Sequence, residues 1–366
     1  MAFKIPFDAD AIAKGLSKIT KDVSDAAQSA AKGASGLAQD AVSNLQSVDI
    51  AKAASDSVKN VTDFAQDTAG KVAGVAGKTA SDIQTSVIAV FDENGDGQIS
   101  IEDIIIMGLK VPGIRIDRTA FLKQELFKNH TQEEIDDAIA FNPAHAHIDR
   151  EEIDKIADEV ISYERNCVSG ISAALGMPGG VAIAATIPTD IAQYYGYMLR
   201  AAQKLLYLYG FPEIDLSEKG QKFDSETINA LTICLGVMFG VAKANSVIKA
   251  MAQMLAVGVE KKLLKAALTK GTIYPIVKSI ASWFGKKMTK DVFAGFFKNS
   301  IPVIGGAIGG GLTFLSFKPC CDKLKASLQD TLLSNPDHQS SDEEMKIVEE
   351  IESTAIDMDE PENNTV

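Results

Sequence analysis

The chain has 366 residues, of which 46% are hydrophobic and 23% charged, and its formal net charge is −13. Because a single core rarely grows beyond roughly 250–300 residues, this length predicts more than one structural unit. The four cysteines have neither CxxC spacing nor a regular framework, which favours a reducing, intracellular compartment. No apolar run of signal-peptide length follows Met1, so we expect no export.

The charge is divided among three unlike segments. Residues 92–165 hold 18 acidic and 8 basic residues, and residues 337–366 hold 11 acidic residues against one lysine. Between them, residues 243–325 contain 14 lysines, no arginine and three acidic residues. We call residues 243–325 the lysine-rich segment. An acidic chain with one basic, apolar segment predicts contact between these parts or with an external charged surface.

Residues 1–82 are rich in alanine, serine, lysine and aspartate, and their apolar residues recur at helical spacings of three and four. Several glycines weaken this pattern, each by about 1 kcal/mol relative to alanine. The region is therefore predicted to be a long amphipathic helix or a partly disordered spacer. An interfacial membrane helix and a coiled-coil partner are the remaining alternatives.

Residues 92–103, DENGDGQISIED, match the 12-residue loop of an EF-hand. The expected oxygen ligands are Asp92, Asn94, Asp96, Gln98 through its backbone carbonyl, Ser100 directly or through water, and Asp103. Gly97 permits the sharp turn, and apolar helical segments flank the loop on both sides. The sequence predicts a calcium site here, and the alternative is a solvated acidic turn.

One position of this loop departs from the EF-hand pattern. The twelfth residue is normally glutamate, which binds Ca²⁺ with both oxygens, whereas Asp103 is one methylene shorter. We therefore expect weaker Ca²⁺ binding, or binding of Mg²⁺ as well. A second loop, FNPAHAHIDREEI from Phe141, echoes the apolar positions but lacks ligands, so it is a candidate metal-free partner. Its His145 and His147 are expected to be exposed loop residues rather than metal ligands.

The rest of the chain also has a helical pattern, and no catalytic motif stands out. Helices are expected near residues 119–128, 131–140 and 149–164, and Thr131 with Glu134 predicts a capping box. Uncharged stretches at 166–189, 228–242 and 301–317 are broken by proline or glycine or are short, which favours buried helices over membrane spans. The acidic tail is expected to be disordered, apart from one or two helical turns near residues 345–351.

The lysine-rich segment favours an anionic lipid surface over nucleic acid as partner. Arginine is the usual residue for bidentate phosphate and base recognition, whereas lysine suits snorkelling at a lipid surface. Aromatic residues including Trp283 and Phe284 lie among the lysines of residues 283–298, as in an interfacial segment. The alternative is a basic solvated face above a buried aromatic core.

Three stretches together resemble the EcsC protein family. They are NPAHAHIDREEIDKIADEVISYERN from Asn142, GMPGGVAIAATIPTDIAQYYGYMLRAAQKLLYLYGFPEI from Gly176, and IPVIGGAIGGGLTF from Ile301. The resemblance covers about residues 131–327 and implies a bacterial, cytoplasmic or membrane-associated helical protein without an assigned activity or cofactor. The EF-hand lies outside it.

These observations predict an all-α protein with four parts. They are the N-terminal region (1–82), an EF-hand and acidic helical region (83–165), an EcsC-like helical domain (166–328) and an acidic disordered tail (329–366). The expected function is that of a non-enzymatic, Ca²⁺-responsive module. Its expected partner is an anionic membrane surface or a membrane protein. Its expected location is the cytoplasm, or the periphery of the membrane at its inner face. The alternatives are a lipid-modifying or hydrolytic enzyme, for which Asp190 near Tyr194 and Tyr195 is the candidate site, and a structural module stabilised by Ca²⁺. The oligomeric state is left open.

Overall fold

The computed structural model describes Asp92 and residues 100–111, 113–176, 182–216, 223–259, 261–287 and 305–359. These residues form eleven α-helices and no strand, which confirms the predicted all-α class. The expected N-terminal helical region, residues 1–82, lies outside the described residues.

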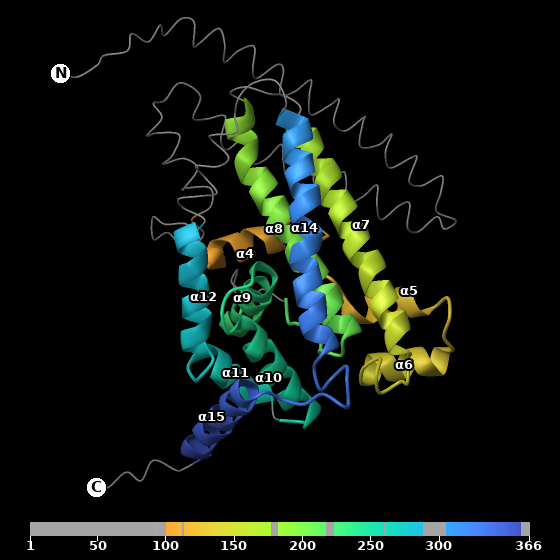
Figure 1. The fold of residues 1–366 in the computed structure, drawn as a ribbon, viewed down its shortest axis with the longest axis vertical. Coiled ribbons are helices and arrows are strands. Elements are labelled where there is room, and N and C mark those ends of the chain that lie inside the picture. The colour runs from red at the N-terminus through yellow and green to blue at the C-terminus, as the bar shows by residue number, and fades with distance from the viewer. Residues whose placement is uncertain are drawn as a thin grey trace, which may run out of the picture.

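Three long helices form the centre of the fold: α7 (Arg150–Gly176), α8 (Ala182–Leu208) and α14 (Gly305–Gln329). Each of them packs against the other two, and α7 makes its most extensive contact with α14 (Figure 1). α7 is described up to Gly176 and α8 from Ala182, and the glycines and proline between them, which predict a break, lie outside the described residues. No described helix is both long enough and apolar enough to cross a bilayer.

A second group of helices follows α8 in the chain. It consists of α9 (Ser225–Phe239), α10 (Ala244–Ala256), α11 (Lys261–Thr269) and α12 (Tyr274–Lys287). Helix α9 is buried on most of its surface and contacts α10, α11, α12 and α14, so it joins this group to the long helices. Gly240, with φ of 70°, ends α9 in the left-handed conformation that glycine adopts without strain.

The helices from the acidic region pack around the long helices at different places. α4 (Ile101–Lys110) crosses α8, and α5 (Arg118–Leu126) packs on α6 (Gln132–Ala140) (Figure 1). The predicted capping box of α6 is present, with Thr131 and Glu134 bonding each other's backbone amides. Arg118 joins α5 to α6 because its guanidinium donates to the carbonyls of Ala138, Ile139 and Phe141.

The expected division at residues 165/166 does not separate two structural units. Helix α7 runs through this point without a break, and a single hydrophobic core contains residues from both sides of it. The amphipathic segment 149–164 was correctly predicted as helix, and its apolar residues belong to the same core as Val168, which lies beyond the division. The acidic helical region is therefore part of the main fold.

The acidic tail also differs from expectation. Residues 342–359 form a helix, α15 (Asp342–Asp359), that packs against α10 and α11. Its apolar residues Ile347, Val348 and Ile351 are buried, whereas its acidic residues are mostly exposed. Burial of this narrow stripe supplies the stabilisation that the charged composition lacks by itself.

Candidate functional site

We call residues 92–103 the predicted calcium loop; the structure describes its first residue, Asp92, and its C-terminal end from Ser100, where α4 begins. Ser100 is the N-cap of α4, and its hydroxyl accepts a hydrogen bond from the amide of Asp103 at 3.2 Å. In return, Oδ2 of Asp103 accepts from the amide and the hydroxyl of Ser100, at 2.8 and 2.5 Å. The ninth and twelfth loop positions thus form a capping box, and the carboxylate of Asp103 is fully buried.

This geometry is compatible with an oxygen-ligated cation. A carboxylate has two oxygens with about four lone-pair sites, so Asp103 can cap α4 and still present an oxygen to an ion. Asn94, Asp96 and Gln98 lie outside the described residues, as do the neighbours of Asp92. Within the described part of the chain, no group of three or more His, Cys, Asp or Glu residues is placed to hold a metal.

The helices next to the two predicted loops have different neighbours. Helix α4, which follows the calcium loop, packs on α8, α9 and α12, whereas α6, which precedes the second loop, packs on α5 (Figure 1). His145 and His147 are exposed on this loop, as expected, and the ring of His145 lies 4.3 Å from that of Phe141.

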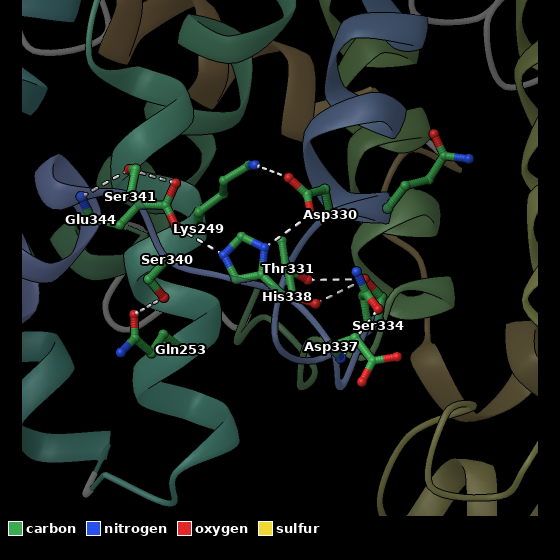
Figure 2. A network of polar contacts seen from close by, with 12 residues as sticks. Lys249, Gln253, Asp330, Thr331, Ser334, Asp337, His338, Ser340, Ser341 and Glu344 are labelled. Atoms are coloured by element: carbon green, nitrogen blue, oxygen red, sulfur yellow. Dashed lines mark hydrogen bonds and ion pairs between the residues drawn. The ribbon is translucent and has the colours of Figure 1, made fainter.

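A polar network holds the acidic tail onto the lysine-rich segment (Figure 2). Nδ1 of His338 lies 2.9 Å from a carboxylate oxygen of Asp330, and Nε2 lies 2.9 Å from one of Glu344. Lys249 of α10 donates to the other oxygen of Asp330 at 2.5 Å. We call these four residues, Lys249, Asp330, His338 and Glu344, the tail latch.

The tail latch is shielded from solvent at its centre. The side chains of His338 and Glu344 are only 3% and 6% exposed. Each ring nitrogen of His338 lies within hydrogen-bonding distance of a carboxylate oxygen. Hydrogen bonds from Lys249 and His338 lower the pKa of Asp330 to about 2.

Further contacts continue from the tail latch along α10. The hydroxyl of Ser246 donates to Glu343 at 2.7 Å, and that of Ser340 donates to Gln253 at 2.9 Å. Ser341 caps α15 by accepting from the amide of Glu344. The acidic helix is therefore joined to the start of the lysine-rich segment by both polar and apolar contacts.

A second charged cluster is buried between α7 and α8. The carboxylate of Glu164 is fully buried, and its Oε1 accepts from Arg200 at 3.0 Å and from Lys204 at 2.6 Å. Burial acts to raise the pKa of Glu164, but the charges and hydrogen bonds of Lys204 and Arg200 outweigh it and leave the pKa lowered. Arg200 also donates to the carbonyl of Gly113, which joins the chain after α4 to this cluster.

Two of the three residues proposed for an enzymatic site, Tyr194 and Tyr195, make packing contacts. The hydroxyl of Tyr194 pairs with that of Ser316 at 3.0 Å, and the ring of Tyr195 stacks on Phe239. Burial raises the pKa of both tyrosines well above its usual value. The side chain of Asp190 lies outside the described residues.

The aromatic residues of the lysine-rich segment that the structure describes face inward. Phe284 is buried, and its ring and that of Trp283 contact Phe239. This favours a buried aromatic core at α12. Phe293, Phe296 and Phe297, which also lie among the lysines of residues 283–298, are outside the described residues.

Sequence analysis missed the tail latch and the Glu164 cluster. Their members come from positions up to 95 residues apart, from Lys249 to Glu344 in the tail latch, so no local spacing connects them. The only local signal was the helical spacing of Ile347, Val348 and Ile351 within the tail. Comparison of the chain with protein-family models, with curated proteins and with solved structures found no match.

Proposed function

We propose that this chain is a non-enzymatic, calcium-binding helical protein of the EcsC type, in which an acidic C-terminal helix masks a basic surface that associates with anionic membranes. The observation that carries this proposal is the docking of α15 on α10 and α11, at the start of the lysine-rich segment. A negatively charged segment that covers a basic one lowers its attraction for any other anionic surface.

The calcium loop would regulate this masking through charge and through the position of α4. Asp92, Asn94, Asp96, the carbonyl of Gln98, Ser100 and Asp103 would hold the ion, which supplies positive charge to the acidic region. Asp103 lies in the first turn of α4, and α4 packs on α8, α9 and α12. A change in the loop can therefore reach the core helices through α4.

The test combines calorimetric titration with vesicle flotation of the full chain. Ca²⁺ is titrated with and without millimolar Mg²⁺ into the wild type and into Asp92→Ala, and the same samples are floated with phosphatidylserine-containing and with neutral vesicles. We expect binding that Asp92→Ala weakens at least tenfold, and flotation that increases with Ca²⁺ only for anionic vesicles. Flotation unaffected by Ca²⁺ in the wild type would refute the switch.

The masking step has its own variants. Ile347→Asp with Val348→Asp places charge on the buried face of α15, whereas Met345→Asp adds charge at an exposed position of the same helix. We expect the double variant to float with anionic vesicles without Ca²⁺, and Met345→Asp to behave as the wild type. If the double variant gains no vesicle binding although α15 is released, as hydrogen exchange would report, a membrane-protein partner becomes the better proposal.

A purely structural role for the metal is the second candidate, and the capping box of α4 favours it. Because Ser100 and Asp103 fix the first turn of α4, ion binding there would stabilise the fold directly. This role predicts a higher melting temperature with Ca²⁺ and no change in flotation.

A further inference from the structure

The described residues form a cavity of about 360 Å³ where helices α9, α10 and α11 meet the end of α8. Small-molecule sites are typically concave, have volumes of about 300–1,000 Å³ and are lined mostly by apolar groups. The buried wall of this cavity is mainly apolar, and all four helices contribute to it: Leu206, Ile233, Ile248, Met251 and Leu268. The cavity thus has the size and the lining of a site for a small apolar molecule.

The wall formed by the segment after α8 is held by hydrogen bonds at both ends. The guanidinium of Arg118 donates to the carbonyl of Phe211 at 3.2 Å, and the hydroxyl of Thr227 in α9 donates to the carbonyl of Asp215 at 2.8 Å. The side-chain amide of Asn229 in α9 donates to a backbone carbonyl of α11 at 2.9 Å. Because three of its walls are joined in this way, the cavity is present before any ligand binds.

The charged residues of the described lining already have partners within the protein. Lys265 lies 2.6 Å from Asp224 and 3.1 Å from Glu226. Glu213 accepts a hydrogen bond from the first amide of α5 at 3.3 Å, and Asp215 has a partner as well. An ionised ligand would therefore give up its hydration among apolar walls without gaining an unpaired counter-charge from the described lining.

We propose that this cavity binds a neutral aliphatic molecule of medium chain length, such as a fatty alcohol. Its chain lies among the buried wall residues, where each methylene group removed from water favours binding. Taking about 30 Å³ for each water-sized unit, the cavity has room for roughly a dozen non-hydrogen atoms. An ionised head group on the same chain weakens binding, because the apolar walls do not replace its lost hydration.

Calorimetric titration of the full chain with three ligands of matched chain length tests this proposal. At neutral pH octanol is uncharged, octylamine is cationic and octanoate is anionic, and all three are used below their aggregation concentrations. We expect saturable binding of octanol that is at least tenfold stronger than that of either ionised ligand. Uptake of octanol that does not saturate, or equal or stronger binding of octylamine or octanoate, would overturn the proposal.

Substitutions locate the binding within the chain. Ala230→Phe and Leu255→Trp each add bulk to the cavity wall at a partly buried position, so we expect them to fold and to weaken octanol binding at least tenfold. Ala242→Phe adds the same bulk at an exposed position after α9 and is the matched control, which should bind octanol as the wild type does.

Melting temperatures give a second readout. Octanol should raise the melting temperature of the wild type and of Ala242→Phe, and should leave those of the two wall variants unchanged. Octanol binding that survives both wall substitutions, or that Ala242→Phe weakens to the same extent, would refute the site.

Discussion

Gly108 of α4 and Gly196 of α8 face each other where the two helices cross. A Cβ atom on Gly108 would lie 3.2 Å from the backbone nitrogen of Gly196, and one on Gly196 would lie 3.3 Å from the carbonyl oxygen of Gly108. The absence of side chains at both positions lets the two backbones approach closely. Helix α4, which follows the predicted calcium loop, therefore packs directly on α8, a central helix of the fold.

Substitution of Gly108 by valine should separate the two helices. The obstacle is backbone of α8, which cannot move aside like the end of a flexible side chain, so we expect a loss of about 1–3 kcal/mol in the free energy of unfolding. The control is Lys110→Val at an exposed position of α4, which should change the free energy of unfolding by less than about 0.5 kcal/mol. Urea unfolding measures the free energy of unfolding of both variants. Equal losses in the two variants would show that the crossing of α4 and α8 tolerates a side chain.

The calcium loop and the helix cap can be separated by mutation. Asp103→Ala removes the capping box and should cost about 1 kcal/mol of stability even with a chelator present, because the amide of Ser100 loses its partner. Asp92→Ala removes a predicted ligand without affecting the cap, so we expect this variant to lose stability relative to the wild type only in the presence of Ca²⁺. Unfolding of both variants in chelator and in millimolar Ca²⁺ checks this difference. Equal stability of the two variants in chelator would contradict the role assigned to the cap.

Acid should weaken the tail latch. The pKa of Asp330 is lowered from 3.8 to about 2 by Lys249 and His338, so its ionised form is favoured by folding. A carboxylate with a lowered folded-state pKa contributes stability above its unfolded-state pKa of about 4, and this contribution is lost as the pH falls toward 2. We expect the melting temperature of the wild type to exceed that of Asp330→Asn at pH 6, and this difference to narrow below pH 4.

A gap in melting temperature that stays constant from pH 6 to pH 3 would show that Asp330 contributes through something other than its charge. Asp337→Asn is a suitable control, since it is an exposed carboxylate one residue before His338. Its melting temperature should follow that of the wild type throughout.

Neutralising Glu164 should be the most damaging single charge change in the described core. Glu164→Gln leaves Arg200 and Lys204 without their buried counter-charge, and losing one partner of a buried ion pair costs about 3–5 kcal/mol. Glu159→Gln, at an exposed position of the same helix, is the matched control and should be nearly neutral. Chemical denaturation of both variants measures the difference, and a small effect at Glu164 would mean that water replaces the carboxylate.

Local patterns were enough to predict much of the helical structure. Thr131 and Glu134 predicted the start of α6, and the apolar stripe from Ile153 to Ile161 predicted the first half of α7. The capping box of Ser100 and Asp103 is also a local pattern of this kind. In the sequence, however, these two residues were interpreted only as metal ligands.

Features that depend on distant residues were not predicted. His338 had no informative neighbours in the sequence, and its partner Asp330 also binds Lys249, which lies on α10. The tail was expected to be disordered because of its charge, whereas the stripe Ile347, Val348 and Ile351 is stabilised by the surface of α10 and α11. In both cases tertiary packing, rather than composition, decides the structure.

The packing of α7 on α14 has a consequence for how the chain is made. The two helices are separated by about 130 residues, and at a synthesis rate of roughly 5–20 residues per second α14 leaves the ribosome about 6–26 s after α7. During this interval α14 has not yet been made, so the apolar face of α7 that it later covers stays exposed to water. Newly made chains therefore pass through a stage with an exposed hydrophobic surface, at which a chaperone can bind and two nascent chains can aggregate.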